Sequence, residues 1–256
     1  MLLSDTGLRF PERTAKPRRH GVTMVIDNGL PTRHFQDVVE SGSDLIDLVK
    51  LGWGTALVTK DLGLKLDALT RAGVEFCFGG TLFEKYVSQG RFDDFTRLLR
   101  EYGARCVEVS NGSIDMPNEE KCEYVRRLAG DFRVVSEVGF KDSKRSLELP
   151  PVRWIEYMRA DLDAGADMVI AEARESGRSG ICRADGELRF GLIEEIIESD
   201  LDVGRILFEA PTKELQTYFI RRLGPNVNLG NIAPDQVIGV ETLRLGLRSD
   251  TLLTWD

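Results

Sequence analysis

The stretch Met168–Gly177, which reads MVIAEARESG, shows the pattern from which the fold is inferred. Four apolar residues are followed at once by Glu172, and then by a run that contains Arg174 and ends in two small residues. A short segment that is apolar on both faces is typical of a parallel strand covered by helices. Charged residues directly after such a strand lie at its carboxyl end, where α/β folds place their sites. The stretch therefore predicts a buried parallel strand that ends in candidate site residues.

Seven further runs of this kind are distributed along the chain. They are residues 22–26, 45–51, 75–78, 106–109, 134–138, 206–208 and 227–229. The midpoints of successive runs lie about 20–37 residues apart, which is the spacing of repeated strand–helix units rather than of hairpins.

Helical patterns occupy the segments between these runs. In residues 92–102 and 154–166, apolar side chains recur on one helical face. Pro31, Pro117 and Pro211 stand where helices are expected to begin. On the helix after residue 151, Asp161 and Asp163 are expected on a solvated face. Trp53, Trp154 and Trp255 are interpreted as packing residues.

Eight strand–helix units without a dividing linker predict an α/β fold, a single (β/α)8 TIM barrel. The expected domain covers residues 1–256, with residues 1–20 as an N-terminal extension. A doubly wound open sheet is the alternative, because it uses the same alternation of strands and helices.

Composition excludes several classes of protein. The formal net charge is −8, from 34 Lys and Arg against 42 Asp and Glu, and duplex binding depends on basic residues that neutralise phosphates. A nucleic-acid partner is therefore not expected, and neither is a membrane partner, because no apolar run approaches the ~20 residues of a spanning helix.

The location and assembly of the chain are inferred from similar arguments. The four cysteines are scattered without metal-ligand spacing, and no secretory signal is visible. These features favour a reduced cytoplasmic setting. A homo-oligomer is expected only because most soluble oligomers are homo-oligomers.

Charged residues collect at the predicted carboxyl ends of the strands. Glu108, Glu137, Glu172 and Glu209 each come from a different strand, and Lys50 ends another. A Glu on an apolar strand is costly to bury unless it is paired, hydrogen-bonded or bound to metal. An all-oxygen set of ligands suits Mg²⁺, whereas Zn²⁺ prefers His or Cys. Each Glu taken alone has a simpler interpretation, as a partner of a nearby Arg or as a helix cap, and Lys50 could pair with a neighbouring Asp.

Several of these segments resemble the phosphosulfolactate synthase family. The similar stretches are 23–27, 46–55, 79–84, 137–139, 141–142, 172–177, 208–211, 224–232 and 241–251. The resemblance extends from about residue 15 to residue 252. Asn111, between Ser110 and Gly112, is similar to the bacterial branch, because archaeal members often have Asp there.

The resemblance implies a Mg²⁺-dependent addition of sulfite to C3 of phosphoenolpyruvate, which gives (2R)-O-phospho-3-sulfolactate. It implies that Glu108, Glu137 and Glu172 bind the metal or stand beside its ligands, with Glu209 as an alternative ligand or a group behind the ligands. Lys141 is the expected proton donor and Lys50 the alternative.

The substrates themselves, phosphoenolpyruvate and sulfite, are anionic, and the resemblance implies that Arg174 and Arg178 hold their sulfonate or phosphate groups. Further substrate-binding groups are expected at Ser176, Gly177, Asn228, Gly230 and Asn231. The run from Glu175 to Gly180 also resembles a backbone nest that binds an anion.

Two other functions remain as alternatives. The first is a barrel lyase or aldolase in which Lys50 or Lys141 forms a Schiff base. The second is a non-catalytic, stress-related barrel like that of the plant branch of the family.

Overall fold

The computed structural model describes residues 6–255, so the first five residues of the predicted extension and residue 256 lie outside the described part. Within residues 6–255, eight strands form one parallel sheet. The strands are β1 (Thr23–Asp27), β2 (Leu48–Leu51), β3 (Glu75–Phe78), β4 (Cys106–Val109), β5 (Arg133–Val138), β6 (Met168–Ala171), β7 (Ile206–Glu209) and β8 (Asn228–Ile232). Each strand overlaps one of the runs predicted from the sequence.

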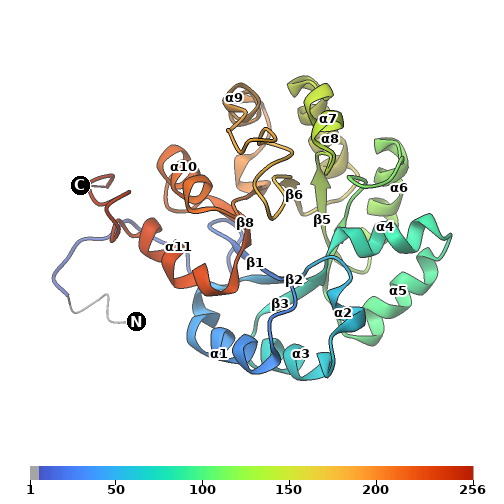
Figure 1. The fold of residues 1–256 in the computed structure, drawn as a ribbon, viewed down its shortest axis with the longest axis horizontal. Coiled ribbons are helices and arrows are strands. Elements are labelled where there is room, and N and C mark those ends of the chain that lie inside the picture. The colour runs from blue at the N-terminus through green and yellow to red at the C-terminus, as the bar shows by residue number, and fades with distance from the viewer. Residues whose placement is uncertain (1–5, 256) are drawn as a thin grey trace.

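The strand order identifies the sheet as a barrel. Neighbouring strands follow the order β3-β2-β1-β8-β7-β6-β5-β4, in which the first strand pairs with the last. The two ends of this order, β3 and β4, lie next to one another, so the sheet is a nearly closed cylinder with helices around it (Figure 1). The prediction of a (β/α)8 barrel is confirmed, and the alternative of a doubly wound open sheet is wrong.

Helices connect the successive strands and cover the outside of the barrel (Figure 1). They are α1 (Thr32–Gly42), α2 (Thr55–Val58), α3 (Leu62–Arg71), α4 (Gly80–Ser88), α5 (Phe92–Glu101), α6 (Asn118–Ala129), α7 (Ser143–Glu148), α8 (Pro151–Asp163), α9 (Phe190–Glu198), α10 (Lys213–Leu223) and α11 (Val237–Arg244). Among residues 6–255, no helix has both the length and the apolar character that crossing a bilayer requires.

The predicted helical faces pack as the periodicity indicates. In α5, Phe92, Phe95 and Leu99 are buried, and in α8 Trp154 and Met158 are fully buried. These side chains form the main core between the sheet and the helices. Spacing of three and four residues places them on one side of each helix, which therefore lies flat against the barrel.

Asp161 departs from this pattern. It was expected on a solvated face of α8, but its exposed fraction is 0%. Asp163 is exposed as predicted. The expectation for Asp161 is wrong because the ammonium group of Lys121 in α6 lies 2.7 Å from its carboxylate and compensates the buried charge.

The inside of the barrel has an apolar layer below a charged layer. The apolar layer consists of Val22, Met24, Leu48, Cys77, Cys106, Val135, Met168, Ile170 and Leu207. Side chains two positions further along a strand point to the same face. The next inward side chains after Leu48, Cys106, Val135, Ile170 and Leu207 are therefore the five charged residues Lys50, Glu108, Glu137, Glu172 and Glu209. The fold thus collects these groups at the carboxyl ends of the strands.

The N-terminal segment lies against the opposite end of the barrel. Arg13 forms an ion pair with Glu241 of α11 at 2.9 Å and donates to the carbonyl of Pro225. Lys16 donates to the carbonyls of Ser43 and Ile46. These contacts attach the described part of the predicted extension to loops at the amino ends of the strands.

Candidate active site

The floor of the site is an ion-pair cluster around Lys50. Its ammonium group lies 3.0 Å from Glu108 and 3.0 Å from Glu209, and all three side chains are at most 5% exposed. Burial lowers the pKa of Lys50, but the two carboxylates outweigh it and raise that pKa well above its usual value. Lys50 is therefore a charged ammonium group at neutral pH, and it holds the two glutamates in place.

The second half of the site centres on Glu137. Its carboxylate accepts a hydrogen bond from Ser110 at 2.8 Å and lies 3.4 Å from the ammonium group of Lys141. Burial raises the pKa of Glu137, but Lys141 and Lys50 outweigh it and hold that pKa at about 2. Lys141 also donates to the hydroxyl of Thr81 at 3.0 Å, which fixes its ammonium group above the carboxylates.

The pKa of Glu172 is shifted in the opposite direction from that of Glu137. Burial, together with the neighbouring Glu137 and Glu209, raises the pKa of Glu172 well above its usual value. One oxygen accepts from the backbone N–H of Arg174 at 2.6 Å. The other oxygen, which is buried, meets no hydrogen-bond donor in the described part of the chain. It is therefore available to a ligand that enters the site.

Three of the four predicted metal ligands come together. Oxygen atoms of Glu137, Glu172 and Glu209 all lie within 4.8 Å of one another. Glu108 is not in this group; one of its oxygens accepts from the N–H of Gly80 at 2.6 Å and the other pairs with Lys50. The triad, and not the complete set of four, is the arrangement that fits a cation.

The rim of the site consists of Trp53, Arg174 and Asn231. These residues line the cavity above the glutamates, and all three have a left-handed backbone, with φ of 50°, 54° and 53°. Such conformations cost non-glycine residues about 1 kcal/mol or more and often mark functional sites. Trp53, interpreted from the sequence as a packing residue, is 41% exposed and lines the opening.

Other predicted substrate-binding residues lie elsewhere. Ser176, Gly177 and Arg178 line a separate cavity of about 390 Å³ beside α10. Asn228 is at the amino end of its strand, where it accepts from the N–H of Val22 and donates to two carbonyls near the start of β7. None of these four residues lines the cavity above the glutamates.

Gly230 has a packing reason of its own. A Cβ atom at this position would lie 2.2 Å from a methyl carbon of Leu207 and 3.0 Å from Met24. The glycine lets β8 approach the interior layer directly below the site. Its carbonyl accepts from the N–H of Ala210, so that backbone oxygen is already engaged.

Sequence reasoning missed Glu84. This residue of α4 is 1% exposed and accepts from the hydroxyl of Ser110 at 2.9 Å and from the N–H of Ser113 at 3.0 Å. The Ser110 hydroxyl oxygen thus lies within hydrogen-bonding distance of both Glu84 and Glu137, and it donates its single proton to one of them at a time. The available signal was an acid directly after Leu82 and Phe83, on the first helix after a Gly-Gly-Thr strand end. Its position on a helix gave no indication that it lies close to the glutamates at the strand ends.

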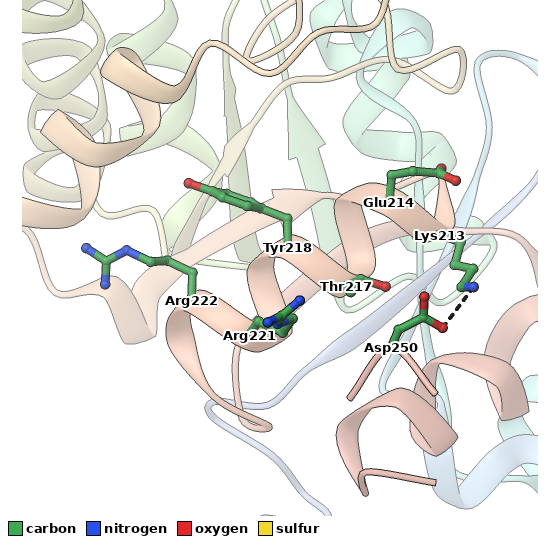
Figure 2. Close-up of a pocket in the computed structure, with 7 residues that line it drawn as sticks. All are labelled: Lys213, Glu214, Thr217, Tyr218, Arg221, Arg222 and Asp250. Atoms are coloured by element: carbon green, nitrogen blue, oxygen red, sulfur yellow. Dashed lines mark ion pairs between the residues drawn. The ribbon is translucent and has the colours of Figure 1, made fainter. Parts of the chain in front are cut away.

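A larger cavity lies far from these residues. It has a volume of about 550 Å³ and faces outward from α10 (Figure 2). It is lined by Lys213, Glu214, Thr217, Tyr218, Arg221, Arg222 and Asp250. Figure 2 shows Lys213 directed at Asp250, and the two form an ion pair at 2.8 Å. This cavity contains none of the predicted site residues.

Comparison with known proteins agrees with the resemblance inferred from the sequence. The family model described as (2R)-phospho-3-sulfolactate synthase (ComA) matches residues 11–250. The phosphosulfolactate synthase of Bacillus subtilis (strain 168) is 49% identical over 97% of this chain and 99% of its own length. That of Methanothermobacter thermautotrophicus is 42% identical over 94% of this chain and 95% of its own.

A solved structure of a 3-hexulose-6-phosphate synthase has a TM-score of 0.56 over 87% of this chain and 97% of that chain. At 13% sequence identity this likeness concerns the barrel fold alone. The family model and the relatives are more specific, because they match nearly the whole chain at high identity. The chain therefore belongs to the (2R)-phospho-3-sulfolactate synthase family of enzymes.

Proposed function

We propose that this chain catalyses the Mg²⁺-dependent addition of sulfite to C3 of phosphoenolpyruvate, giving (2R)-O-phospho-3-sulfolactate. The observation that carries the proposal is the buried triad of Glu137, Glu172 and Glu209 beside the ammonium group of Lys141. In a member of this family, that arrangement combines oxygen ligands for a cation with a proton donor at one site.

The reaction needs one bond to carbon and one proton. The sulfur lone pair of sulfite forms a bond to C3, and the double-bond electrons move through C2 toward the substrate carboxylate. Lys141 then donates a proton to one face of C2, which fixes the configuration. Its side chain is 23% exposed and is held by Thr81 and Glu137, whereas Lys50 is enclosed by Glu108 and Glu209. Lys141 is therefore the better placed donor.

The residues fit a divalent cation by charge and by donor type. Four carboxyl groups (Glu108, Glu137, Glu172 and Glu209) face two ammonium groups, so full ionisation would leave an excess of two negative charges. Oxygen-only ligands suit Mg²⁺. Glu137, Glu172 and Glu209 would hold it, and the bound ion would stabilise negative charge that develops on the substrate carboxylate.

Substrate entry requires the rim to open. The cavity above the triad measures about 20 Å³, which is room for about one or two water molecules. Phosphoenolpyruvate is several times larger, so the side chains of Trp53 and Arg174 move aside when it binds. Arg174, whose guanidinium also donates to the carbonyl of Lys141, then contacts the anionic substrate together with Asn231. Arg178 and the adjoining loop lie one cavity away and would reach the phosphate only after this movement.

The charge state of Lys50 weighs against the Schiff-base alternative. A lysine that attacks a carbonyl must lose its proton first. Carboxylates hold the pKa of Lys50 well above its usual value despite burial, and they raise that of Lys141 in the same way. Borohydride would therefore trap no substrate adduct.

A non-catalytic barrel is the other alternative, and the cost of the cluster argues against it. Buried glutamates that serve no reaction would be more stable as apolar residues. The side chains of Glu108, Glu137 and Glu209 are all at most 2% exposed.

The experiment that tests the proposal is an omission assay. Purified protein is incubated with phosphoenolpyruvate, sulfite and Mg²⁺, each left out in turn, and product is followed by ³¹P NMR. Product only when all three are present is expected. Consumption of phosphoenolpyruvate without sulfite, or no consumption with all three, would refute the proposed reaction.

We also propose a cytoplasmic enzyme that forms a symmetric homo-oligomer. Cys77, Cys106, Cys122 and Cys182 are all free and buried, which suits a reducing compartment. Ile238, Leu252 and Leu253 are exposed apolar side chains, with exposed fractions of 56%, 55% and 77%, and a contact between two copies of the chain would remove such side chains from water.

A further inference from the structure

A buried ion pair lies on the outer side of β5, outside the cavity that holds the glutamates. It joins Lys121 of α6 to Asp161 of α8, two helices that lie side by side against β5 (Figure 1). The ammonium nitrogen and the carboxylate oxygen are 2.7 Å apart, and the two side chains are 1% and 0% exposed. Burying two charges is expensive, and apolar residues of similar size often serve a core equally well. Stability alone therefore does not explain the pair.

The carboxylate of Asp161 is fully engaged. It accepts from the hydroxyl of Ser136 in β5 at 2.7 Å. It also accepts from the amide of Asn118 at 3.3 Å and from the thiol of Cys122 at 3.5 Å, both in α6. These bonds fix the orientation of the carboxylate and connect it to the strand.

Lys121 makes the second contact with the strand. Its ammonium group donates to the backbone carbonyl of Glu137 at 2.8 Å. The parallel pairing of β4 with β5 ends at Val109 and Ser136, one residue before Glu137. Lys121 thus supplies a donor to this carbonyl where the neighbouring strand has ended. Two successive residues of β5, Ser136 and Glu137, are held by the same ion pair.

We infer that Lys121 and Asp161 are positioning residues for the reaction, because they fix the backbone from which the Glu137 carboxylate reaches into the site. On the inner side of the strand, that carboxylate contacts Ser110, Lys141 and Glu172 at once. A shift of the Glu137 peptide would change all three contacts together. Misplacement of reacting groups by about 1 Å can cost about 100-fold in rate.

The positioning role rests on the proposed part of Glu137 in the reaction, so its test includes a variant of Glu137. The main variant is Lys121→Met with Asp161→Leu, an apolar pair of similar size. Replacement of both partners by well-packed apolar residues is often neutral or stabilising. In the double variant the donor to the Glu137 carbonyl is lost, and Ser136, Asn118 and Cys122 lose their carboxylate acceptor as well, so folding is checked by the thermal midpoint.

Matched controls come from the same two helices. Val125 of α6 and Met158 of α8 are both fully buried, and Val125→Ala and Met158→Ala perturb packing without touching the ion pair. For every variant, kcat per folded molecule, the KM for each substrate and the thermal midpoint are measured.

The expected result separates positioning from stability. Lys121→Met/Asp161→Leu loses about tenfold or more in kcat, keeps the KM values, and has a thermal midpoint no lower than those of the controls. Lys121→Gln/Asp161→Asn, which retains neutral donors without the charges, recovers most of the lost kcat. A parental kcat in the apolar double variant, or the same loss in the amide double variant and the controls, would overturn the inference.

Two further arms keep the result decisive. If the apolar double variant does not fold, Ser136→Ala removes one of the two bonds between the ion pair and the strand, the one made by Asp161, and a parental kcat in it would count against positioning through Asp161. Glu137→Gln is measured in parallel. Parental turnover in Glu137→Gln would refute the role of Glu137 and the positioning with it. A large loss of kcat in Glu137→Gln, together with a parental kcat in the apolar double variant, would refute the positioning role of Lys121 and Asp161 and leave the role of Glu137 intact.

Discussion

Replacing Lys50 by Met tests whether the ammonium group shared by Glu108 and Glu209 stabilises the folded protein. Lys50 lies 3.0 Å from Glu108 and 3.0 Å from Glu209, and the carboxylates are 2% and 1% exposed. Removing one partner of a buried ion pair costs about 3–5 kcal/mol, because the remaining charge stays buried. Two carboxylates lose their partner here, so the free energy of unfolding is expected to fall by about 5 kcal/mol.

Lys65→Met is the matched control. Lys65 pairs with Asp27 at 2.5 Å, and both side chains are at most 2% exposed. Asp27 also accepts from the N–H groups of Gly29 and Leu30, which remain in the variant. The loss of free energy of unfolding should therefore lie nearer about 3 kcal/mol.

The assay is urea unfolding followed by circular dichroism, in EDTA, at pH 5 and pH 8. Burial raises the pKa of Glu108 and Lys50 opposes this shift, so in Lys50→Met the folded-state pKa of Glu108 lies further above its unfolded value. Stability from such groups is complete below the unfolded pKa and is lost as pH rises through the folded pKa. The difference between the parent and Lys50→Met should therefore be larger at pH 8 than at pH 5. A loss below about 1 kcal/mol, the value typical of a surface pair, or an equal loss at both pH values would refute the reasoning.

Three other changes give equally specific expectations. Lys141→Met should lower kcat by about 100-fold or more, the usual contribution of a general acid, and should also lower the thermal midpoint, because the buried Glu137 loses a charged partner. Unchanged turnover in the folded variant would remove Lys141 from the role. In EDTA, Glu172→Gln should gain stability relative to the parent between pH 5 and pH 8. Burial raises the pKa of Glu172 in the parent, so the parent loses stability as pH rises through that pKa. The same difference in free energy of unfolding between the parent and Glu172→Gln at pH 5 and at pH 8 would contradict this. Gly230→Ala should destabilise by about 1–3 kcal/mol, because its Cβ would meet Leu207 at 2.2 Å, and additive effects with Leu207→Val in a double-mutant cycle would argue against that contact.

The barrel could be predicted from the sequence because its signals are local. Each strand is a short apolar run, and the helical face of α5 repeats every three or four residues. The start of β2 was placed too early, at residue 45, because Ser43–Leu45 forms a 3-10 turn and the strand begins at Leu48. An apolar run alone does not distinguish a buried turn from a buried strand.

The candidate site was predicted in part. The strand pattern predicted that four glutamates stand at the carboxyl ends of their strands, namely Glu108, Glu137, Glu172 and Glu209. The role of Glu84 did not, because its approach to Ser110 depends on how α4 packs on the barrel.

The sequence by itself determined which segments are strands and which acidic and basic residues stand at their carboxyl ends, since both depend on neighbouring residues only. The tertiary structure decided which of those charges share a cavity. Closure of the barrel brings Lys50 between Glu108 and Glu209, which are 58 and 159 residues further along the chain. The packing of α6 against α8 likewise pairs Lys121 with Asp161. Contacts between residues so far apart depend on the path of the whole chain, and no local pattern encodes them.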